Sequence, residues 1–281
     1  MSFGLEIKKE LSMLSNLANK EEVKYELYGY LLSSNISEEK SKIKFSTESE
    51  YNINRFAKLL KNMNINNFSI EIRGKVFEIT LKKKEIEEIE VQKIKFDEVK
   101  NIDYLRAVIR GIFMGAGSIN NPENTYHLEM KLLDKEKIDV LIYMMKNYDI
   151  NLKATEKTIY IKDGEEISKF LAFIGAEKSV LKFEEIRVQR HMNNKINRLV
   201  NCKTANLERV MNASAEQIVA IGKLKTSGKF QMLDEDLKEL AELRLEHPDM
   251  PLSELGNLLS KPIGKSGVNY RIKKIIEITK R

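Results

Sequence analysis

Residues 105–120, LRAVIRGIFMGAGSIN, have large apolar residues at helical spacing with small residues between them. The prediction of the fold starts from this stretch. Its large apolar residues lie three and four positions apart, which places them on one face of a helix. Each glycine inside a helix costs about 1 kcal/mol relative to alanine, so the glycines here indicate that a second helix approaches closely. We expect the helix to end in a Gly-x-Gly turn at 115–117, and Pro122 stops any helical continuation. The large residues are Leu105, Val108, Ile109, Ile112 and Phe113, and the glycines are Gly111, Gly115 and Gly117.

The same periodicity analysis divides the rest of the first 186 residues into helices and short strands. The first half contains a hairpin whose two alternating runs meet at Gly74, a residue suited to a tight turn. In the first half we predict helices at 5–18, 21–33, 52–63 and 83–90, and strands at 42–49, 68–73 and 75–82. After the helix at 105–116 we predict strands at 126–134, 151–155 and 158–164, and helices at 135–148 and 165–175.

The order of elements repeats, which indicates an internal duplication. Gly29 and Gly111 are 82 positions apart, and Ile79 and Ile161 are separated by the same 82 positions. A shared offset in two different elements favours duplication over the alternative of two unrelated α+β stretches. The glycine-bearing helices would then open the two copies and pack against each other.

The charge distribution separates the C-terminal third from the rest. The chain has 281 residues, 42% hydrophobic and 32% charged, enough for two or three domains with their own cores. The net charge is +6, but residues 187–281 hold 18 Lys and Arg against 11 Asp and Glu, which leaves about −1 for residues 1–186. This asymmetry predicts that the C-terminal third meets a polyanion, and nucleic acid is the natural candidate. The alternative is a solvated basic surface.

Few residues are suited to redox, metal or cofactor chemistry. A single cysteine, Cys202, excludes a disulfide framework, and we expect it to be a small buried thiol. The three histidines are scattered without metal-ligand spacing, so we predict no metal site, no cofactor and no small-molecule substrate. We see no signal peptide and no apolar run of the roughly 20 residues that span a bilayer, so we expect a cytoplasmic, nucleoid-associated protein without a membrane partner.

The duplicated order and the glycine-bearing opening helices resemble the two-domain LAGLIDADG homing endonucleases. Residues 109–117 read IRGIFMGAG and residues 27–35 read LYGYLLSSN against the nine-letter motif. The resemblance implies that Gly29, Gly111 and Gly115 serve helix-pair packing beneath a saddle formed by two sheets. Asn35 replaces the last glycine of the first copy, a change we attribute to the access of asparagine to the left-handed region.

The resemblance also implies a lost active site. The endonucleases place an acidic residue before the last glycine of each motif, and two such carboxylates hold divalent metal for phosphodiester hydrolysis. Here these positions are Ser34 and Ala116, which supply no carboxylate. Glu26 and Asp103 lie elsewhere on the two helices, so we do not expect them to substitute.

Longer motifs resemble the WhiA family of bacterial regulators from end to end. They are SFGLEIKKEL, RGIFMGAGSINNPENTYHLEM, NNKINRLVNCKTANLERV and LSELGNLLSKPIGKSGVNYRIKKI. The resemblance implies an α+β fold, in which a duplicated LAGLIDADG-type two-repeat saddle precedes an all-α helix-turn-helix domain. We therefore expect repeats at 1–95 and 96–186, a basic linker at 187–212 and a helix-turn-helix domain at 213–281.

The segment that joins the two parts is purely basic at its start. Residues 187–203 hold five basic residues and no acidic one, which favours contacts with DNA phosphates over a merely solvated connector. A helix at 214–225 would then begin with Ser214 as its cap. The candidate backbone contacts are Arg187, Arg190, Lys195, Arg198 and Lys203.

The tail has the pattern of a helix-turn-helix unit, with helices at 234–246 and 252–260, a KPIG turn and a last helix. On that last helix Val268, Ile272, Ile275 and Ile276 cluster on one face and should point inward. Asparagine pairs with adenine and lysine with guanine, while a helix amino-terminus suits a phosphate. The alternative to a DNA-binding unit is an ordinary helical hairpin with a solvent-exposed basic face, in which Tyr270 covers the apolar core. The candidate DNA-binding residues are Lys265, Ser266, Asn269, Tyr270, Arg271, Lys273 and Lys274, of which Arg271 and Lys274 should mainly contact the backbone.

Together these features predict a non-catalytic, sequence-specific binder of double-stranded DNA. The WhiA resemblance adds a role as a transcription regulator in sporulation, cell division or chromosome segregation. Two alternatives stay open, namely an active metal-dependent endonuclease and an adaptor whose N-terminal saddle binds another transcription regulator.

Overall fold

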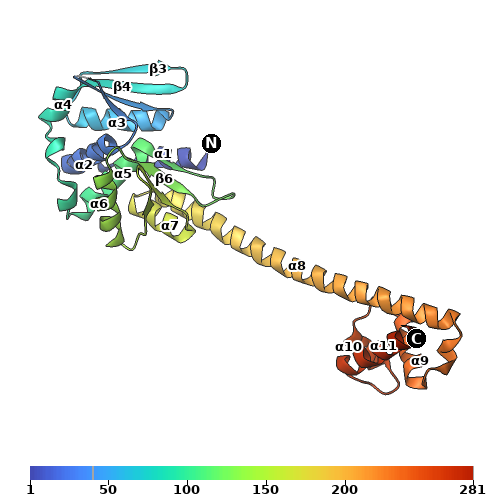
Figure 1. Cartoon of the computed structure of the whole chain (residues 1–281). Coiled ribbons are helices and arrows are strands. Elements are labelled where there is room, and N and C mark those ends of the chain that lie inside the picture. Colours follow the sequence, from blue (N-terminus) through green and yellow to red (C-terminus); the bar gives the residue numbers. More distant parts are fainter. Residues whose placement is uncertain (40, 281) are drawn as a thin grey trace. The chain divides into compact units, whose positions relative to one another are not determined.

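The structure is a computed structural model that describes residues 1–39 and 41–280 (Figure 1). The chain forms two compact units, of which the first covers Met1–His191 and the second begins at Met192. Each unit has its own hydrophobic core.

The first half of the N-terminal unit folds into an antiparallel sheet with helices against one side of it. The strand order is β1-β2-β4-β3, so the chain makes a hairpin, crosses over through a helix and returns as a second hairpin. In sequence order the elements are α1 (Phe3–Ser12), η1 (Asn16–Ala18), α2 (Lys20–Leu32), β1 (Ile36–Glu39), β2 (Lys42–Thr47), α3 (Glu50–Asn62), β3 (Phe68–Arg73), β4 (Val76–Lys82) and α4 (Lys83–Glu88), followed by η2 (Val91–Lys93) and η3 (Phe96–Glu98).

The second half repeats this order. Its sheet has the strand order β5-β6-β8-β7, the same topology as the first, and the predicted duplication of an α+β unit is confirmed. The pairings correspond as well, since Phe45 lies opposite Ile79 in the first sheet and Leu128 lies opposite Ile161 in the second. The elements are α5 (Ile102–Ala116), β5 (Gly117–Ile119), β6 (Leu128–Lys131), α6 (Lys135–Lys146), β7 (Lys153–Ala154), β8 (Thr158–Ile161) and α7 (Gly164–Phe173). The exact repeat boundaries at 95 and 186 stay a prediction.

The two opening helices begin in the same way. The Asn19 side chain accepts hydrogen bonds from the backbone of Glu21 and Glu22 at the start of α2, and the Asn101 side chain does the same for Asp103 and Tyr104 at the start of α5. Such caps satisfy backbone N–H groups that have no partner within the helix, and each contributes about 1 kcal/mol. Asn19 and Asn101 are 82 positions apart, so the offset read from the glycines extends to the caps.

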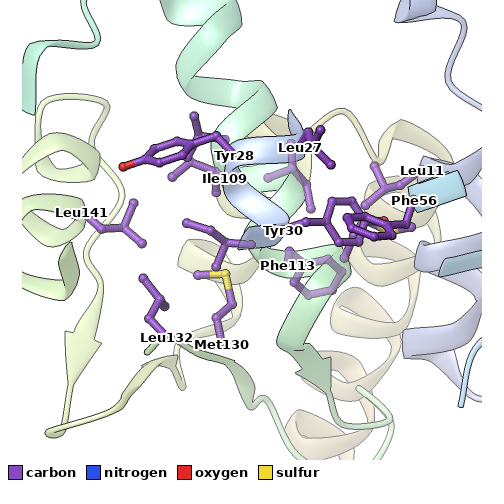
Figure 2. Packing of buried hydrophobic residues seen from close by; sticks show 14 of the residues in the cluster. Leu11, Leu27, Tyr28, Tyr30, Phe56, Ile109, Phe113, Met130, Leu132 and Leu141 are labelled. Carbon is purple, nitrogen blue, oxygen red and sulfur yellow. The ribbon is translucent and has the colours of Figure 1, made fainter. Parts of the chain in front are cut away.

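The core of the first unit lies between the helices and one face of each sheet. Alternate residues of β2, including Ile43 and Phe45, are buried, while the residues between them are more exposed. Figure 2 shows Tyr30 and Phe56 together on one side of the central helices, and Met130, Leu132 and Leu141 on the other. The ring centroids of Tyr30 and Phe56 are 5.0 Å apart. Both repeats therefore contribute side chains to one continuous core.

Helices α2 and α5 cross where Gly29 meets Gly111. A Cβ atom on Gly29 would lie 2.1 Å from the carbonyl oxygen of Val108, and one on Gly111 would lie 2.1 Å from the carbonyl oxygen of Glu26. Gly115 is also constrained, because its Cβ would lie 2.4 Å from the Ser33 hydroxyl oxygen. Since backbone atoms cannot yield, the crossing requires residues without side chains at Gly29 and Gly111.

Two expectations about the end of the opening helices are wrong. Helix α5 does not end in a glycine turn, because Gly117 is extended, with φ −85°, and begins strand β5. Asn35 does not replace a left-handed glycine either, since it has no positive φ. Its amide instead donates a hydrogen bond of 2.8 Å to the carbonyl oxygen of Gly115. Asn35 thus ties the first motif to the end of the second.

In the described residues of the second unit all secondary-structure elements are helices. The first of them, α8 (Glu177–Thr226), begins in the first unit. The predicted helix start at Ser214 is wrong, because α8 runs through this position. The Ser214 hydroxyl instead donates to the carbonyl oxygen of Pro248. The remaining elements are η4 (Lys229–Met232), α9 (Glu235–Glu246), α10 (Leu252–Leu258) and α11 (Lys265–Lys280).

Candidate nucleic-acid interface

Helices α10 and α11 form a tight helix-turn-helix pair against α9. The pair shares a core with the end of α8, to which Leu224, Leu255 and Ile272 contribute. Gly256 allows the turn to close, because a Cβ there would lie 2.2 Å from the carbonyl oxygen of Ile263. The Ile263 backbone N–H in turn donates to the Gly256 carbonyl oxygen at 3.1 Å. The sequence therefore builds a short turn of fixed geometry before the last helix.

Helix α11 separates an apolar face from a polar one. Val268, Ile272 and Ile275 are buried against the core of the unit, as the spacing of these residues predicts. Tyr270 is 71% exposed and so does not cover the core. The other residues of the polar face that are exposed are Lys265, Ser266, Asn269, Lys273 and Lys274. Amide, ammonium and hydroxyl groups thus line one side of a helix whose amino-terminal turn also points N–H groups outward.

Two of the candidate residues are already paired within the unit. Arg271 donates to Asp236 at 2.8 Å, and Lys274 donates to Asp234 at 3.2 Å. Both acids lie at the beginning of α9, where a helix favours negative charge. The sequence pattern predicts backbone contacts for Arg271 and Lys274 but does not reveal these two ion pairs. In the folded unit each would have to share or release a carboxylate before it could neutralise a phosphate.

Two residues that were not singled out in the sequence hold the segments before and after α10 in place. The Glu239 carboxylate accepts hydrogen bonds from the Ser260 backbone N–H at 2.6 Å and from the Ser260 hydroxyl at 3.0 Å. Buried Arg244 donates to the carbonyl oxygens of His247, Pro248 and Met250, the last at 2.8 Å. Burial lowers the pKa of the Arg244 guanidinium. A charged residue on the buried face of α9 was the signal available in the sequence.

The basic residues of α8 divide into two groups. Arg187 pairs with Glu184 at 2.9 Å, and Arg190 donates to the carbonyl oxygens of Pro122 and Asn124 at 2.6 and 3.1 Å. Arg190 also lies over the Tyr126 ring, 4.3 Å from its centroid, so it fastens α8 to the loop before β6. The structure therefore gives Arg187 and Arg190 intramolecular contacts.

Lys195, Arg198 and Lys203 form the second group of basic residues on α8, and all three are exposed. Nearby Cys202 is exposed as well, which contradicts the expectation of a buried thiol. The expectation failed because residues 192–209 of α8 have little protein packed against them. These three cations are therefore accessible to a phosphate backbone.

The two positions at which the resemblance implies lost acids lie at the ends of the crossing helices. Ala116 is the last residue of α5, and Ser34 follows the end of α2. The Ser34 backbone N–H donates to the Lys131 carbonyl oxygen at 3.0 Å, so this position is held by a strand of the other repeat. Within the described residues, no group of three or more histidine, cysteine or acidic side chains could hold a metal ion.

A buried ionic network lies inside the helix crossing. Glu26 is fully buried, and its carboxylate accepts hydrogen bonds from Arg55 at 2.8 Å and from Arg110 at 3.0 Å. Burial on its own raises the pKa of Glu26, but the positive charges of Arg110 and Arg55 outweigh burial and hold the pKa below its usual value. The network thus keeps Glu26 ionised and away from any substrate. Its signal in the sequence was an acid between the apolar positions of α2.

Comparison with known families covers both units. The model of the WhiA LAGLIDADG-like domain matches residues 105–193, and the model of the WhiA C-terminal HTH domain matches residues 196–279. The chain belongs to the WhiA family. The match to the WhiA LAGLIDADG-like domain begins at α5, and the match to the WhiA HTH domain includes the α10–α11 pair.

Individual relatives agree with this assignment. The chain is 44% identical over 183 residues to a protein of Clostridium beijerinckii named "Probable cell division protein WhiA", which covers 64% of this chain and 58% of that protein. The chain therefore spans little more than half the length of the curated relatives that it matches.

Two crystal structures of WhiA proteins are similar to this fold. Full-length DUF199/WhiA from Thermotoga maritima is 29% identical, with a TM-score of 0.63 over 100% of this chain and 99% of that one. The N-terminal LAGLIDADG domain of DUF199/WhiA is 26% identical, with a TM-score of 0.54 over 62% of this chain and 90% of that one. These matches confirm the predicted fold class. Among the described residues of this WhiA chain, no helix is both long and apolar enough to cross a membrane.

Proposed function

We propose that this WhiA chain binds double-stranded DNA in a sequence-specific manner and does not cut it. The observation that carries the proposal is the polar face of α11, where Lys265, Asn269 and Lys273 are exposed while Val268 and Ile272 are buried. In helix-turn-helix proteins the second helix of the pair lies in the major groove of DNA, and its amino-terminal residues reach the base edges. Asparagine is suited to adenine and lysine to guanine.

Backbone contacts would come from exposed cations of α8. Lys195, Arg198 and Lys203 are accessible on α8, and residues 187–281 carry a net charge of +7. Each phosphate neutralised by such a cation releases counterions, so affinity should fall with a log-log slope of about one unit per contact. Arg271 and Lys274 would contact the backbone only after their ion pairs with Asp236 and Asp234 break.

The absence of carboxylates at Ser34 and Ala116 supports binding without cleavage. Hydrolysis of a phosphodiester in two-metal sites relies on hard anionic oxygens that hold the ions, and serine and alanine supply none. The acid at the helix crossing, Glu26, is buried and accepts hydrogen bonds from two arginines. We therefore do not favour an active endonuclease.

A role in transcription regulation follows from specific binding without chemistry. The WhiA relatives are named probable cell division proteins, and the family resemblance extends the proposed role to sporulation or chromosome segregation. The protein would then act on the nucleoid, in the cytoplasm.

A second candidate function for the first unit is an adaptor that docks another transcription regulator protein. Two observations favour it. Two cations of the first sheet are paired with acids, since Lys44 pairs with Glu39 at 2.9 Å and Arg73 with Glu71 at 2.8 Å. The edge strand β3 also exposes Ile72 to 65%. An edge strand with an exposed apolar side chain is suited to protein contacts.

The direct test selects duplexes bound by the full-length chain from a random-sequence pool and sequences them. Enrichment of a shared sequence is expected, with no nicking when Mg²⁺ is present. A pool that stays random after several rounds contradicts specific binding, and cleavage of the selected duplex contradicts the non-catalytic proposal. Binding by the first unit to a protein partner alone would favour the adaptor.

A further inference from the structure

A polar cavity of about 630 Å³ opens on the first unit beside α1. Its lining comes from α1, from the segment after α2, from the junction between β2 and α3, and from β5. Hydroxyl and amide side chains dominate the polar part of the lining, which includes Asn35, Ser46, Thr47, Ser49 and Ser118. None of the functional assignments made so far uses this cavity.

One lysine in the cavity lacks a partner. Lys8 lines the cavity from α1, and burial lowers its pKa to about 8, with no carboxylate near enough to oppose that effect. Within the described residues, no acid pairs with it. Burying an unpaired ammonium is unfavourable, and a bound anion would remove that penalty. Other cations of this unit, such as Lys44 and Arg73, do have acidic partners.

The surrounding backbone and hydroxyls also suit an anion. The cavity is bordered by the amino-terminal ends of two helices, α1 with its cap Ser2 and α3 with its cap Ser49, and helix amino-termini attract negative charge. The Thr47 and Ser49 oxygens each accept hydrogen bonds from Asn52. Within the described residues, neither hydroxyl donates to an acceptor. Both protons are therefore available to a ligand oxygen.

The charge of the lining selects among anions. Glu48 is the second charged residue of the cavity, and its negative charge would repel a bound anion. A dianion such as free phosphate would meet this carboxylate with two charges, whereas a phosphodiester carries one. The lining therefore favours a phosphodiester over a phosphate monoester or inorganic phosphate.

We propose that Lys8 and the hydroxyls of Thr47 and Ser49 form a binding site for a phosphodiester group of the DNA backbone. This inference rests on the proposed DNA-binding function and adds a contact from the first unit. The contact is independent of sequence, because it recognises phosphate and not a base. Removal of Lys8 should weaken binding uniformly across sequences and reduce the salt slope by about one unit.

The test uses the full-length chain, a long duplex containing the selected sequence and a second duplex of unrelated sequence. Affinities are measured by fluorescence anisotropy across a salt titration for wild type, Lys8→Gln, Lys8→Arg and Lys9→Gln. Lys9 is the matched control, because it lies next to Lys8 on α1 but over the Tyr51 ring, 5.7 Å from the ring centroid, and does not line the cavity. We expect Lys8→Gln to lose about one slope unit on both duplexes, and Lys8→Arg and Lys9→Gln to keep it.

Three outcomes separate this inference from the proposed function. Equal slopes for wild type and Lys8→Gln, with DNA still bound, overturn the Lys8 site and leave the role of α11 intact. Failure of the wild-type chain to bind either duplex overturns both. The third outcome comes from urea unfolding of wild type and Lys8→Gln, compared in phosphate and in chloride at equal ionic strength. Stabilisation by phosphate that disappears in Lys8→Gln would identify a free-phosphate site and contradict a DNA contact.

Discussion

The Glu26 carboxylate on α2 accepts a hydrogen bond of 3.0 Å from the Arg110 guanidinium on α5, so one buried ion pair joins the two repeats. Arg55 completes the network from α3 with two hydrogen bonds of 2.8 Å. The pair lies at the crossing where Gly29 and Gly111 bring the helix backbones together. A structural ion network thus holds the crossing of the two repeats together.

Loss of the Glu26 charge should destabilise the first unit in a pH-dependent way. Glu26→Gln leaves two buried arginines without their anion, which should cost about 3 kcal/mol at pH 7. The pKa of Glu26 lies below its usual value of 4.5 in the folded state, so its stabilisation is complete above pH 4.5 and is lost as the pH falls below it. The difference between wild type and variant should therefore be constant from pH 8 to about pH 5.5 and shrink at lower pH.

Urea unfolding followed by tyrosine signals measures this difference, because nine of the ten tyrosines lie in residues 1–191. Glu39→Gln is the control, since Glu39 is a fully exposed acid whose pKa is lowered by a hydrogen bond from Lys44. It should leave the unfolding midpoint nearly unchanged. A Glu26→Gln deficit that stays the same down to pH 3 would contradict the role assigned to the ionised carboxylate.

The glycines at the crossing should be intolerant of even one methyl group. Gly111→Ala places a Cβ within 2.1 Å of the Glu26 carbonyl oxygen, so the helices must separate, at a cost of about 3 kcal/mol. Gly4→Ala on α1 is the control, because its Cβ would make ordinary contacts of 3.4 Å or more with Ile119. Unfolding midpoints measured by the tyrosine signal should fall for Gly111→Ala and change little for Gly4→Ala. Equal midpoints in the two variants would refute the close crossing.

The acids of α9 should restrain DNA binding by occupying two cations of α11. Exchange of Asp234 and Asp236 for asparagine releases Lys274 and Arg271, so affinity should rise and the salt slope should steepen by one to about two units. Asp249→Asn removes an acid that pairs with no cation among the described residues and serves as the control. Anisotropy titrations at several salt concentrations provide both quantities. A double variant whose slope equals that of Asp249→Asn would show that Arg271 and Lys274 do not reach the backbone.

Cleavage should be absent at the site of the lost acids. Ser34 and Ala116 provide no oxygen anions for a metal, so a bound duplex should stay intact through long incubation with Mg²⁺ or Mn²⁺. Denaturing electrophoresis of an end-labelled duplex detects a single nick. Metal-dependent nicking that survives Glu26→Gln and requires this chain would overturn the non-catalytic account.

Much of this architecture could be predicted from the periodicity of the chain. The 82-residue offset between Gly29 and Gly111 was correct for the duplication because close packing admits only glycine at both positions. The alternation over 68–73 and 75–82 predicted both strands of the hairpin at Gly74. On α11 the spacing of Val268, Ile272 and Ile275 gave the buried face. Each success rests on a local pattern with a strong steric or burial cause.

Contacts between segments far apart in the sequence could not be predicted from local periodicity. Strands β1 and β5 are only four and three residues long, too short for a periodic signal, and they form through pairing with β2 and β6. The partners of Arg190 and Glu239 lie 66 and 21 positions away, beyond any local pattern. Ser214 was mistaken for a helix cap because a polar residue before an apolar run has the same pattern as an interior position of α8.

The central claim, that α11 reads DNA sequence, is tested most directly by the double variant Asn269→Ala with Lys273→Ala. Both residues are exposed, so the variant should fold as wild type does. Its affinity for the selected duplex and for an unrelated duplex is measured by anisotropy at one salt concentration. We predict that the affinity ratio falls at least about tenfold, from the loss of base contacts worth about 1–3 kcal/mol each, while binding to the unrelated duplex falls much less. An unchanged ratio in the double variant would contradict the account.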